Sequence, residues 1–177
     1  MTDTHTVHLM EAIAFAADKH RHQRRKDKEA SPYINHPIAL AHLLVTTAGV
    51  EEPVVLQAAI LHDTIEDTQT SYAELLDRFG KEVADAVAEV TDDKSLPKER
   101  RKELQVEHAP HASRAAALVK LADKICNLRD MAAAPPHGWS LQRRQEYFDW
   151  ARRVVDRLPP VSEALRTAFD AAYAARP

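Results

Sequence analysis

One apolar segment runs directly into a cluster of ionisable side chains, and this pattern constrains the fold more than any other feature of the chain. Residues 54–61 are almost entirely Val, Leu, Ala and Ile, and a histidine and three acids follow: His62, Asp63, Glu66 and Asp67. On one continuous helix these side chains would share roughly one face, because residues three and four apart are neighbours. Like charges beside a buried segment cost several kcal/mol unless a cation neutralises them. The spacing therefore indicates a divalent metal.

The rest of the chain is rich in helix-forming residues and holds only three glycines among 177 residues. Pro37 is expected to open a helix with His36 as its N-cap, and Pro53 to open the helix that carries the His-Asp pair. Helices are also predicted over about 7–22, 71–80, 81–91, 98–107 and 113–130, with one capped by Ser140 and one beyond Pro159-Pro160. Without repeats or long linkers, the sequence predicts one domain, residues 1–177, folded as an all-α helical bundle.

Composition excludes several classes of protein. The formal net charge of −3 argues against general binding to nucleic acid. No apolar run approaches the roughly 18 residues of a membrane span, so no membrane association is expected. The first residues lack the basic start and apolar core of a secretory signal, and Cys126 is the only cysteine, so a reducing cytoplasm is the expected location.

Two further residues would complete a metal site. His36 lies at an expected helix start, and Asp123 is a carboxylate within an otherwise apolar helical segment. With His62 and Asp63 they make a mixed nitrogen and oxygen ligand set that suits Mn²⁺, Fe²⁺ or Zn²⁺. Taken singly, His36 is more simply a capping or surface residue and Asp123 a buried salt-bridge partner. The combination of all four favours a metal.

Glu66 and Asp67 lie too near these ligands to be unrelated to them, yet the ion does not need six ligands from the protein. A metal ion polarises a phosphoryl oxygen and lowers the pKa of bound water, and a neighbouring carboxylate can position and deprotonate the attacking water. The alternative is that the two acids only balance the charge of the ion.

A basic cluster precedes His36 in the chain, comprising Arg24, Arg25, Lys26 and Lys28. Such a run is commonly a solvated loop, but it could also clamp phosphate or stack on a purine base. Three residues on later helices are candidates for the same pocket: Asn127, one turn beyond Asp123, and the i,i+4 pair Arg143 and Tyr147.

These residues resemble the hydrolase domain of the RelA/SpoT-homologue (p)ppGpp enzymes, within the HD-domain phosphohydrolases. The matching stretches are His20-x-x-Gln23-x-Arg25-Lys26, Pro32-Tyr33-Ile34-Asn35-His36-Pro37, Leu61-His62-Asp63-Thr64-Ile65-Glu66-Asp67-Thr68, Phe79-Gly80, Val90-Thr91 and Lys120-Leu121-Ala122-Asp123-Lys124-x-x-Asn127-Leu128-Arg129. The later part, including Thr91-Asp92-Asp93-Lys94, Gln105-Val106-Glu107 and Gly138-Trp139-Ser140, resembles the stand-alone small alarmone hydrolases of the metazoan SpoT-homologue type.

The resemblance implies an all-α HD-domain fold and a set of site residues. The implied Mn²⁺ ligands are His36, His62, Asp63 and Asp123, with Glu66 and Asp67 activating water for attack at the 3′-phosphate. The implied nucleotide contacts are Arg25, Lys26, Asn127 and Tyr147, with Lys98 and Arg143 as further phosphate contacts. It also implies pyrophosphate and GDP or GTP as products, a role in the stringent response, and no alarmone synthesis. Many family members place glycine in the loop before Pro32, where this chain reads Lys28-Glu29-Ala30-Ser31.

Other functions stay open at this stage. The same chemistry could act on another phosphorylated purine nucleotide, such as NADPH with its ribose 2′-phosphate. A catalytically silent nucleotide sensor and a purely structural helical module are further alternatives, although the first does not need both Glu66 and Asp67 and the second leaves the acids unpartnered. The exposed terminal helices could support a homodimer.

Overall fold

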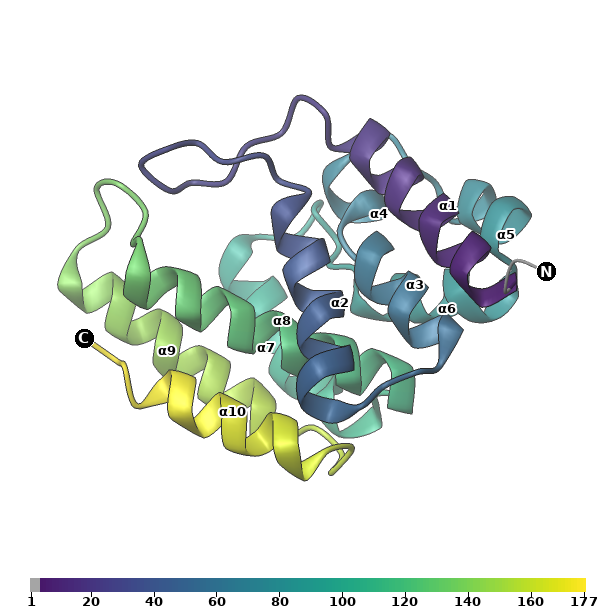
Figure 1. Cartoon of the computed structure of the whole chain (residues 1–177). Helices are drawn as coiled ribbons and strands as arrows, with labels where there is room; N and C mark the ends of the chain where they lie inside the picture. Colours follow the sequence, from purple (N-terminus) through teal and green to yellow (C-terminus); the bar gives the residue numbers. More distant parts are fainter. Residues whose placement is uncertain (1–3) are drawn as a thin grey trace.

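The computed structural model describes residues 4–177 and confirms an all-α fold within them (Figure 1). Its helices are α1 Thr4–Lys19, α2 Asn35–Ala48, α3 Pro53–Leu61, α4 Thr64–Asp67, α5 Tyr72–Phe79, α6 Lys81–Val90, α7 Lys98–His108, the short 3₁₀ helix Ala109–His111, α8 Arg114–Ala133, α9 Leu141–Val155 and α10 Glu163–Tyr173. The described residues form no strand, and only Arg24 and Pro32 make an isolated antiparallel bridge. Residues 1–3, which the single-domain prediction also covers, lie outside the described part.

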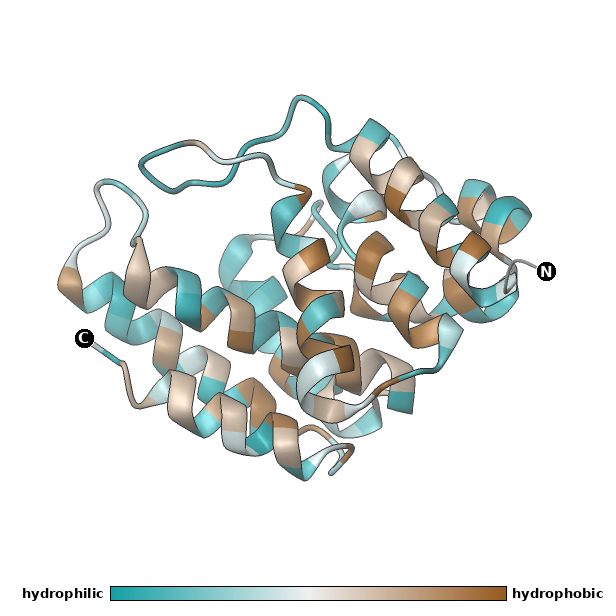
Figure 2. Ribbon diagram, viewed as in Figure 1, coloured by the Kyte–Doolittle hydropathy of each residue, from teal (hydrophilic) through white to brown (hydrophobic). Residues whose placement is uncertain are grey.

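Two helices form the centre of the bundle. The helix α3 packs against α1, α2, α6 and α8, and every residue from 55 to 61 is buried. The helix α8 also contacts α2, α6, α9 and α10, and it buries more residues than any other described helix. Hydrophobic residues gather on α3 and on the inward faces around it, while the outer faces are polar (Figure 2). Asp123 lies on α8 and His62 follows directly after α3, so both are held by the two described helices that bury the most residues.

Several helix boundaries follow the predicted signals. Ser71, Ser113 and Ser140 each accept a hydrogen bond from the backbone N–H three residues on, so each acts as an N-cap. Pro53 is the first residue of α3, and Gly49 ends α2 with φ of 62°, a left-handed conformation that favours glycine.

Two local predictions were wrong. His36 is not an N-cap, because α2 begins at Asn35, two residues before the predicted start at Pro37, and Ile34 precedes it in helical conformation. The expected continuous helix through His62 and Glu66 is also broken: α3 ends at Leu61 and α4 begins at Thr64, with Asp63 at φ −99° and ψ 0° between them. The acids therefore approach the site from a separate turn.

Two irregular segments lie at the same end of the bundle (Figure 1). Residues 20–34 connect α1 to α2, and residues 134–140 connect α8 to α9. Both segments contribute side chains to the wall of one large cavity, so this end of the molecule carries the candidate site. None of the helices in residues 4–177 has the length and apolar character needed to cross a membrane.

Candidate metal centre and nucleotide pocket

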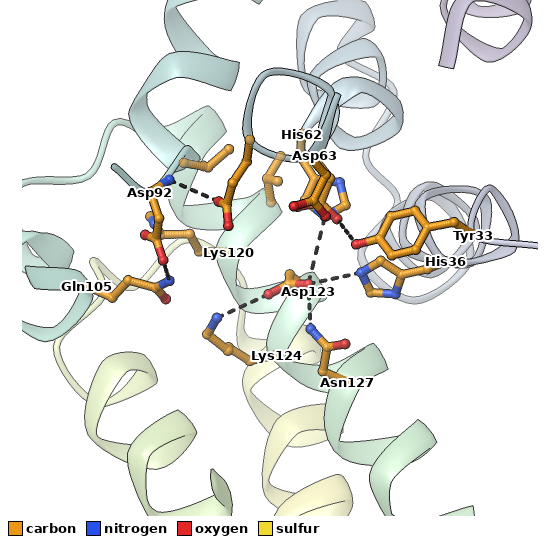
Figure 3. Close-up of a pocket in the computed structure, with 14 residues that line it drawn as sticks. Tyr33, His36, His62, Asp63, Asp92, Gln105, Lys120, Asp123, Lys124 and Asn127 are labelled. Carbon is orange, nitrogen blue, oxygen red and sulfur yellow. Dashed lines mark hydrogen bonds and ion pairs between the residues drawn. The ribbon is translucent and has the colours of Figure 1, made fainter. Parts of the chain in front are cut away.

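The four side chains predicted as metal ligands converge from three places in the fold (Figure 3). His36 comes from the first turn of α2, Asp123 from the middle of α8, and His62 and Asp63 from the break between α3 and α4. Donor atoms of His36, His62 and Asp123 all lie within 4.8 Å of one another. The Asp63 Oδ2 atom lies 2.9 Å from His62 Nε2.

The ring of His62 is held in an orientation that suits a metal ligand. Its Nδ1 donates to the carbonyl oxygen of Ala59 at 2.8 Å, and a carbonyl can only accept, so Nδ1 carries the proton. The buried Nε2 has no hydrogen-bond partner of suitable geometry and faces the carboxylates of Asp63 and Asp123. In the neutral ring, Nε2 therefore presents a lone pair to the acids, as ligation of a cation requires.

The two carboxylates are in turn fixed by neighbours. The hydroxyl of Tyr33 donates to Asp63 Oδ2 at 2.5 Å. Asp123 accepts from Asn127 Nδ2 at 2.7 Å and from Lys124 Nζ at 3.1 Å. Such outer partners orient ligands and set their basicity, so the carboxylates are preorganised.

The four predicted metal ligands, His36, His62, Asp63 and Asp123, form a ligand group whose charges favour a bound cation. Burial alone would lower the pKa of His62, but the adjacent carboxylates of Asp63 and Asp123 raise it to about 9. Burial would raise the pKa of Asp123, but Lys124 and the two histidines hold it well below its usual range. The carboxyl of Asp123 is therefore an anion, and the mixed nitrogen and oxygen donor set fits a first-row divalent ion.

Glu66 and Asp67 face the same cavity as the ligands. The Glu66 Oε2 atom accepts from the backbone N–H of Asp92 at 3.0 Å, and burial raises the pKa of the Glu66 carboxyl. Asp67 accepts from Gln23 Nε2 at 3.0 Å and from Lys94 Nζ at 2.5 Å. Glu66 Oε1 also lies 3.7 Å from Lys94 Nζ. Each acid is therefore held in place by partners outside the four predicted ligands.

Two connected cavities meet at these acids. An inner cavity of about 170 Å³ contains the ligand group, and an outer one of about 730 Å³ opens beyond it. Five residues line both cavities: Tyr33, His36, Glu66, Asp67 and Asn127. The outer cavity has the size of a pocket for a small organic ligand, and its inner end is the candidate metal centre.

The predicted nucleotide contacts divide into two groups. Arg25, Lys26, Asn127 and Tyr147 line the outer cavity. Lys98 and Arg143 do not line it directly; both lie over the ring of Trp139, with Arg143 Cζ at 4.0 Å and Lys98 Nζ at 5.8 Å from the centroid. Trp139 itself lines the cavity, so these two cations contact part of its wall.

Arg25 is anchored, so the basic cluster is not simply a solvated loop. Its NH2 group donates to Asp130 Oδ2 at 2.6 Å and to Asn127 Oδ1 at 3.2 Å, and its guanidinium lies 5.7 Å from the Tyr33 ring centroid. In the same loop Ala30 adopts φ of 50°, a conformation that favours glycine. The backbone of this loop is therefore locally strained at Ala30.

Sequence reasoning assigned no role to several residues that line or support the site. These are Gln23, Tyr33, Lys94, Lys120, Lys124 and Trp139. The available signal was proximity: Lys120 and Lys124 flank Asp123 on one helix, and Gln23 and Tyr33 fall within the matching stretches. The partners of Gln23, Tyr33 and Lys94 in the site are distant in sequence, so no local pattern could have identified those contacts.

Histidines and aspartates gather between the central helices, as expected for an HD-domain protein. Comparison with known families gives the same class. The model of the HD domain family matches residues 12–149, and the chain belongs to this family. Within it, the chain groups with the proteins called guanosine-3′,5′-bis(diphosphate) 3′-pyrophosphohydrolase MESH1. The Homo sapiens protein is 57% identical over 161 residues, covering 91% of this chain and 90% of that protein. The Drosophila melanogaster protein is 46% identical, covering 95% and 94%.

Solved structures agree with this grouping. A structure described as a metazoan ortholog of SpoT that hydrolyses ppGpp superposes with a TM-score of 0.92 at 46% identity, covering 96% of this chain and 95% of that one. A Listeria monocytogenes protein superposes with a TM-score of 0.64 at 27% identity, covering 77% of this chain. The predicted HD-domain fold and the predicted family are therefore confirmed.

Proposed function

We propose that the protein is a metal-dependent guanosine-3′,5′-bis(diphosphate) 3′-pyrophosphohydrolase. The observation that carries this proposal is the placement of the His/Asp group and two further acids at the inner end of a nucleotide-sized cavity whose outer wall holds Arg25 and Lys26. Oxygen from water bonds to the phosphorus attached to the 3′-oxygen, the bond from that phosphorus to the 3′-oxygen breaks, and the 3′-oxygen takes a proton. The products are pyrophosphate and GDP from ppGpp, or GTP from pppGpp.

His36, His62, Asp63 and Asp123 would hold the ion, which we propose to be Mn²⁺. A bound divalent ion supplies a Lewis acid for a phosphoryl oxygen and acidifies a coordinated water. Glu66 and Asp67 hold the attacking water and take up its proton, since both line the cavity that contains the four proposed ligands.

The outer cavity would bind the nucleotide. Arg25 and Lys26 provide cationic contacts at its wall, while Asn127 and Tyr147 provide an amide and a ring surface. Lys98 and Arg143, held over Trp139, would attract phosphate to the same rim. We propose that the protein acts on free nucleotides in the cytoplasm, as part of the stringent response. A homodimer stays a prediction, which light scattering tests.

The test of the proposed function is turnover of ppGpp beside NADPH by metal-stripped protein, with and without added Mn²⁺. We expect pyrophosphate plus GDP from ppGpp, formed only when the metal is present. Products are resolved by chromatography, and metal content is measured in the same samples. Phosphate released from NADPH alone would move the substrate to the 2′-phosphorylated nucleotide, and no product from either would favour a nucleotide sensor.

Loss of the Tyr33 hydroxyl is expected to weaken the metal site without unfolding the protein. The Tyr33→Phe variant removes the hydrogen bond to Asp63 and keeps the ring that packs beside His20 and His36. Loss of one outer partner typically lowers metal affinity by about 10–100-fold. Competition of each protein with a chelating dye measures the dissociation constant. An affinity for Mn²⁺ equal to that of wild type would show that Tyr33 does not orient a ligand.

A further inference from the structure

Two lysines occupy the wall of the inner cavity and take no part in the mechanism above. Lys120 and Lys124 lie one turn apart on α8, on either side of Asp123, and both line the cavity (Figure 3). Lys120 is only 8% exposed and Lys124 only 4%. Lysine is almost never buried to this degree without an anionic partner.

The two lysines differ in what holds them. Lys124 donates to Asp123 at 3.1 Å, and its ammonium lies 4.5 Å from the centroid of the Trp150 ring. Lys120 has no hydrogen bond and no ion pair within 4.0 Å in the part of the chain that the structure describes. Burial and the neighbouring Lys124 lower the pKa of Lys120. No side chain among the described residues pairs directly with this ammonium, so a bound anion would stabilise it further.

The nearby acids are already engaged elsewhere. Asp92 accepts from Gln105 Nε2 at 2.8 Å, and Glu66 accepts from the Asp92 backbone at 3.0 Å. Asp123, the third acid near Lys120, pairs with Lys124. All three acids favour the charged form of Lys120, but none forms a direct pair with it. The N–H donors of Lys120 are therefore not used by a neighbouring side chain, and Lys120 lines the cavity.

The inner cavity has room for more than an ion and a water. Its volume of about 170 Å³ compares with about 10–15 Å³ for a single water on the same kind of measure. The residues that line the inner cavity but not the outer one include Gln105, Val119, Lys120 and Lys124. A group attached to a phosphate at the ligand group could extend into this space.

We propose that Lys120, assisted by Lys124, forms a subsite for the distal phosphate of the 3′-diphosphate group. The inference rests on the proposed function, because it assumes that the phosphate next to the sugar lies at the His/Asp group. The bond between the two phosphorus centres stays intact in the reaction, so the leaving pyrophosphate occupies the same subsite. Lys120 then distinguishes a nucleotide with a 3′-diphosphate from one with a single phosphate.

Binding of inorganic pyrophosphate and inorganic phosphate to the metal-loaded protein tests the subsite without turnover. The variants are Lys120→Met, which keeps length and removes charge, and Lys120→Gln, which keeps a polar end should the first fail to fold. Lys81→Met, on the exposed face of α6, is the matched control. We expect calorimetry to give pyrophosphate binding that is about 10–100-fold weaker in the Lys120 variants, as for loss of a charged hydrogen bond, and phosphate binding within about threefold.

Turnover provides the second arm. The comparison substrate is the nucleotide that lacks the distal phosphate of ppGpp and so carries a single 3′-phosphate. We expect the Lys120 variants to lose about 10–100-fold in kcat/KM for ppGpp, while kcat/KM for the shorter nucleotide changes little. Equal losses for both nucleotides, or unchanged binding of pyrophosphate, would overturn the subsite. If wild type fails to hydrolyse ppGpp but binds pyrophosphate in a Lys120-dependent manner, the proposed function fails and the anion subsite stands.

Discussion

Replacement of His62 by alanine is expected to remove bound metal and turnover together. The Nε2 atom of His62 is buried, has no hydrogen-bond partner of suitable geometry, and lies 2.9 Å from Asp63 and 3.8 Å from Asp123. Without this nitrogen the proposed site keeps only three of its four donor side chains. We expect turnover to fall by more than about 100-fold, beyond the range for loss of an outer partner.

Metal content measured by elemental analysis on purified protein checks this prediction directly. Asp63→Ala should behave in the same way, because it removes the oxygen nearest to His62. His42→Ala is the control, since His42 is exposed on the same helix as His36 and lies outside both cavities. Wild-type metal content in the His62 or Asp63 variant would remove that residue from the ligand set.

The same variants should lose metal-dependent stability. An ion that binds only the folded protein at 100 times its dissociation constant adds about 2.7 kcal/mol. For a chain of this size that corresponds to a rise in Tm of about 5–10 °C in wild type and in the His42→Ala control. The His62→Ala protein should show no such rise on addition of Mn²⁺. A rise equal to that of wild type would place the ion elsewhere in the protein.

The sequence predicted the fold because its strongest signals are local. Serine caps and Pro53 act within one helical turn, and each begins a helix where it was expected to. The four residues proposed as metal ligands could also be singled out from the sequence, since histidines and acids beside buried apolar segments stand out against the helical pattern. Their convergence on one point needed the packing of α2 and α3 against α8.

The predictions that failed depended on local geometry that helical spacing does not describe. The break at His62 and Asp63 separates α3 from α4, so the i,i+4 pairing of one continuous helix does not describe how the acids reach the site. Lys120 could not be singled out from the sequence, where it is one lysine among many. Only the packing around α8 makes it a buried cation that lines a cavity. A buried cation of this kind can be proposed as a binding residue only when the structure shows that no side chain pairs with it.

Replacement of Glu66 should separate chemistry from binding. We expect Glu66→Gln to keep the metal and the nucleotide but to lose turnover by about 10²–10⁴-fold, the usual contribution of a general base. The amide oxygen of glutamine can still accept from the Asp92 backbone N–H, so the loop after α6 keeps its anchor. Glu66→Ala removes that anchor as well, and comparison of the two variants separates loss of basicity from loss of loop position.

The pH dependence gives an independent readout of the same residue. Burial raises the pKa of Glu66, and a base acts only when deprotonated, so wild-type turnover should rise with pH through a pKa above the ordinary glutamate value of about 4.3. The residual activity of Glu66→Gln should lack this step, because the amide does not titrate. Glu82→Ala, an exposed acid on α6, is the control and should keep both the rate and the pH profile. Turnover of Glu66→Gln within twofold of wild type would remove Glu66 from the mechanism and leave Asp67 as the base.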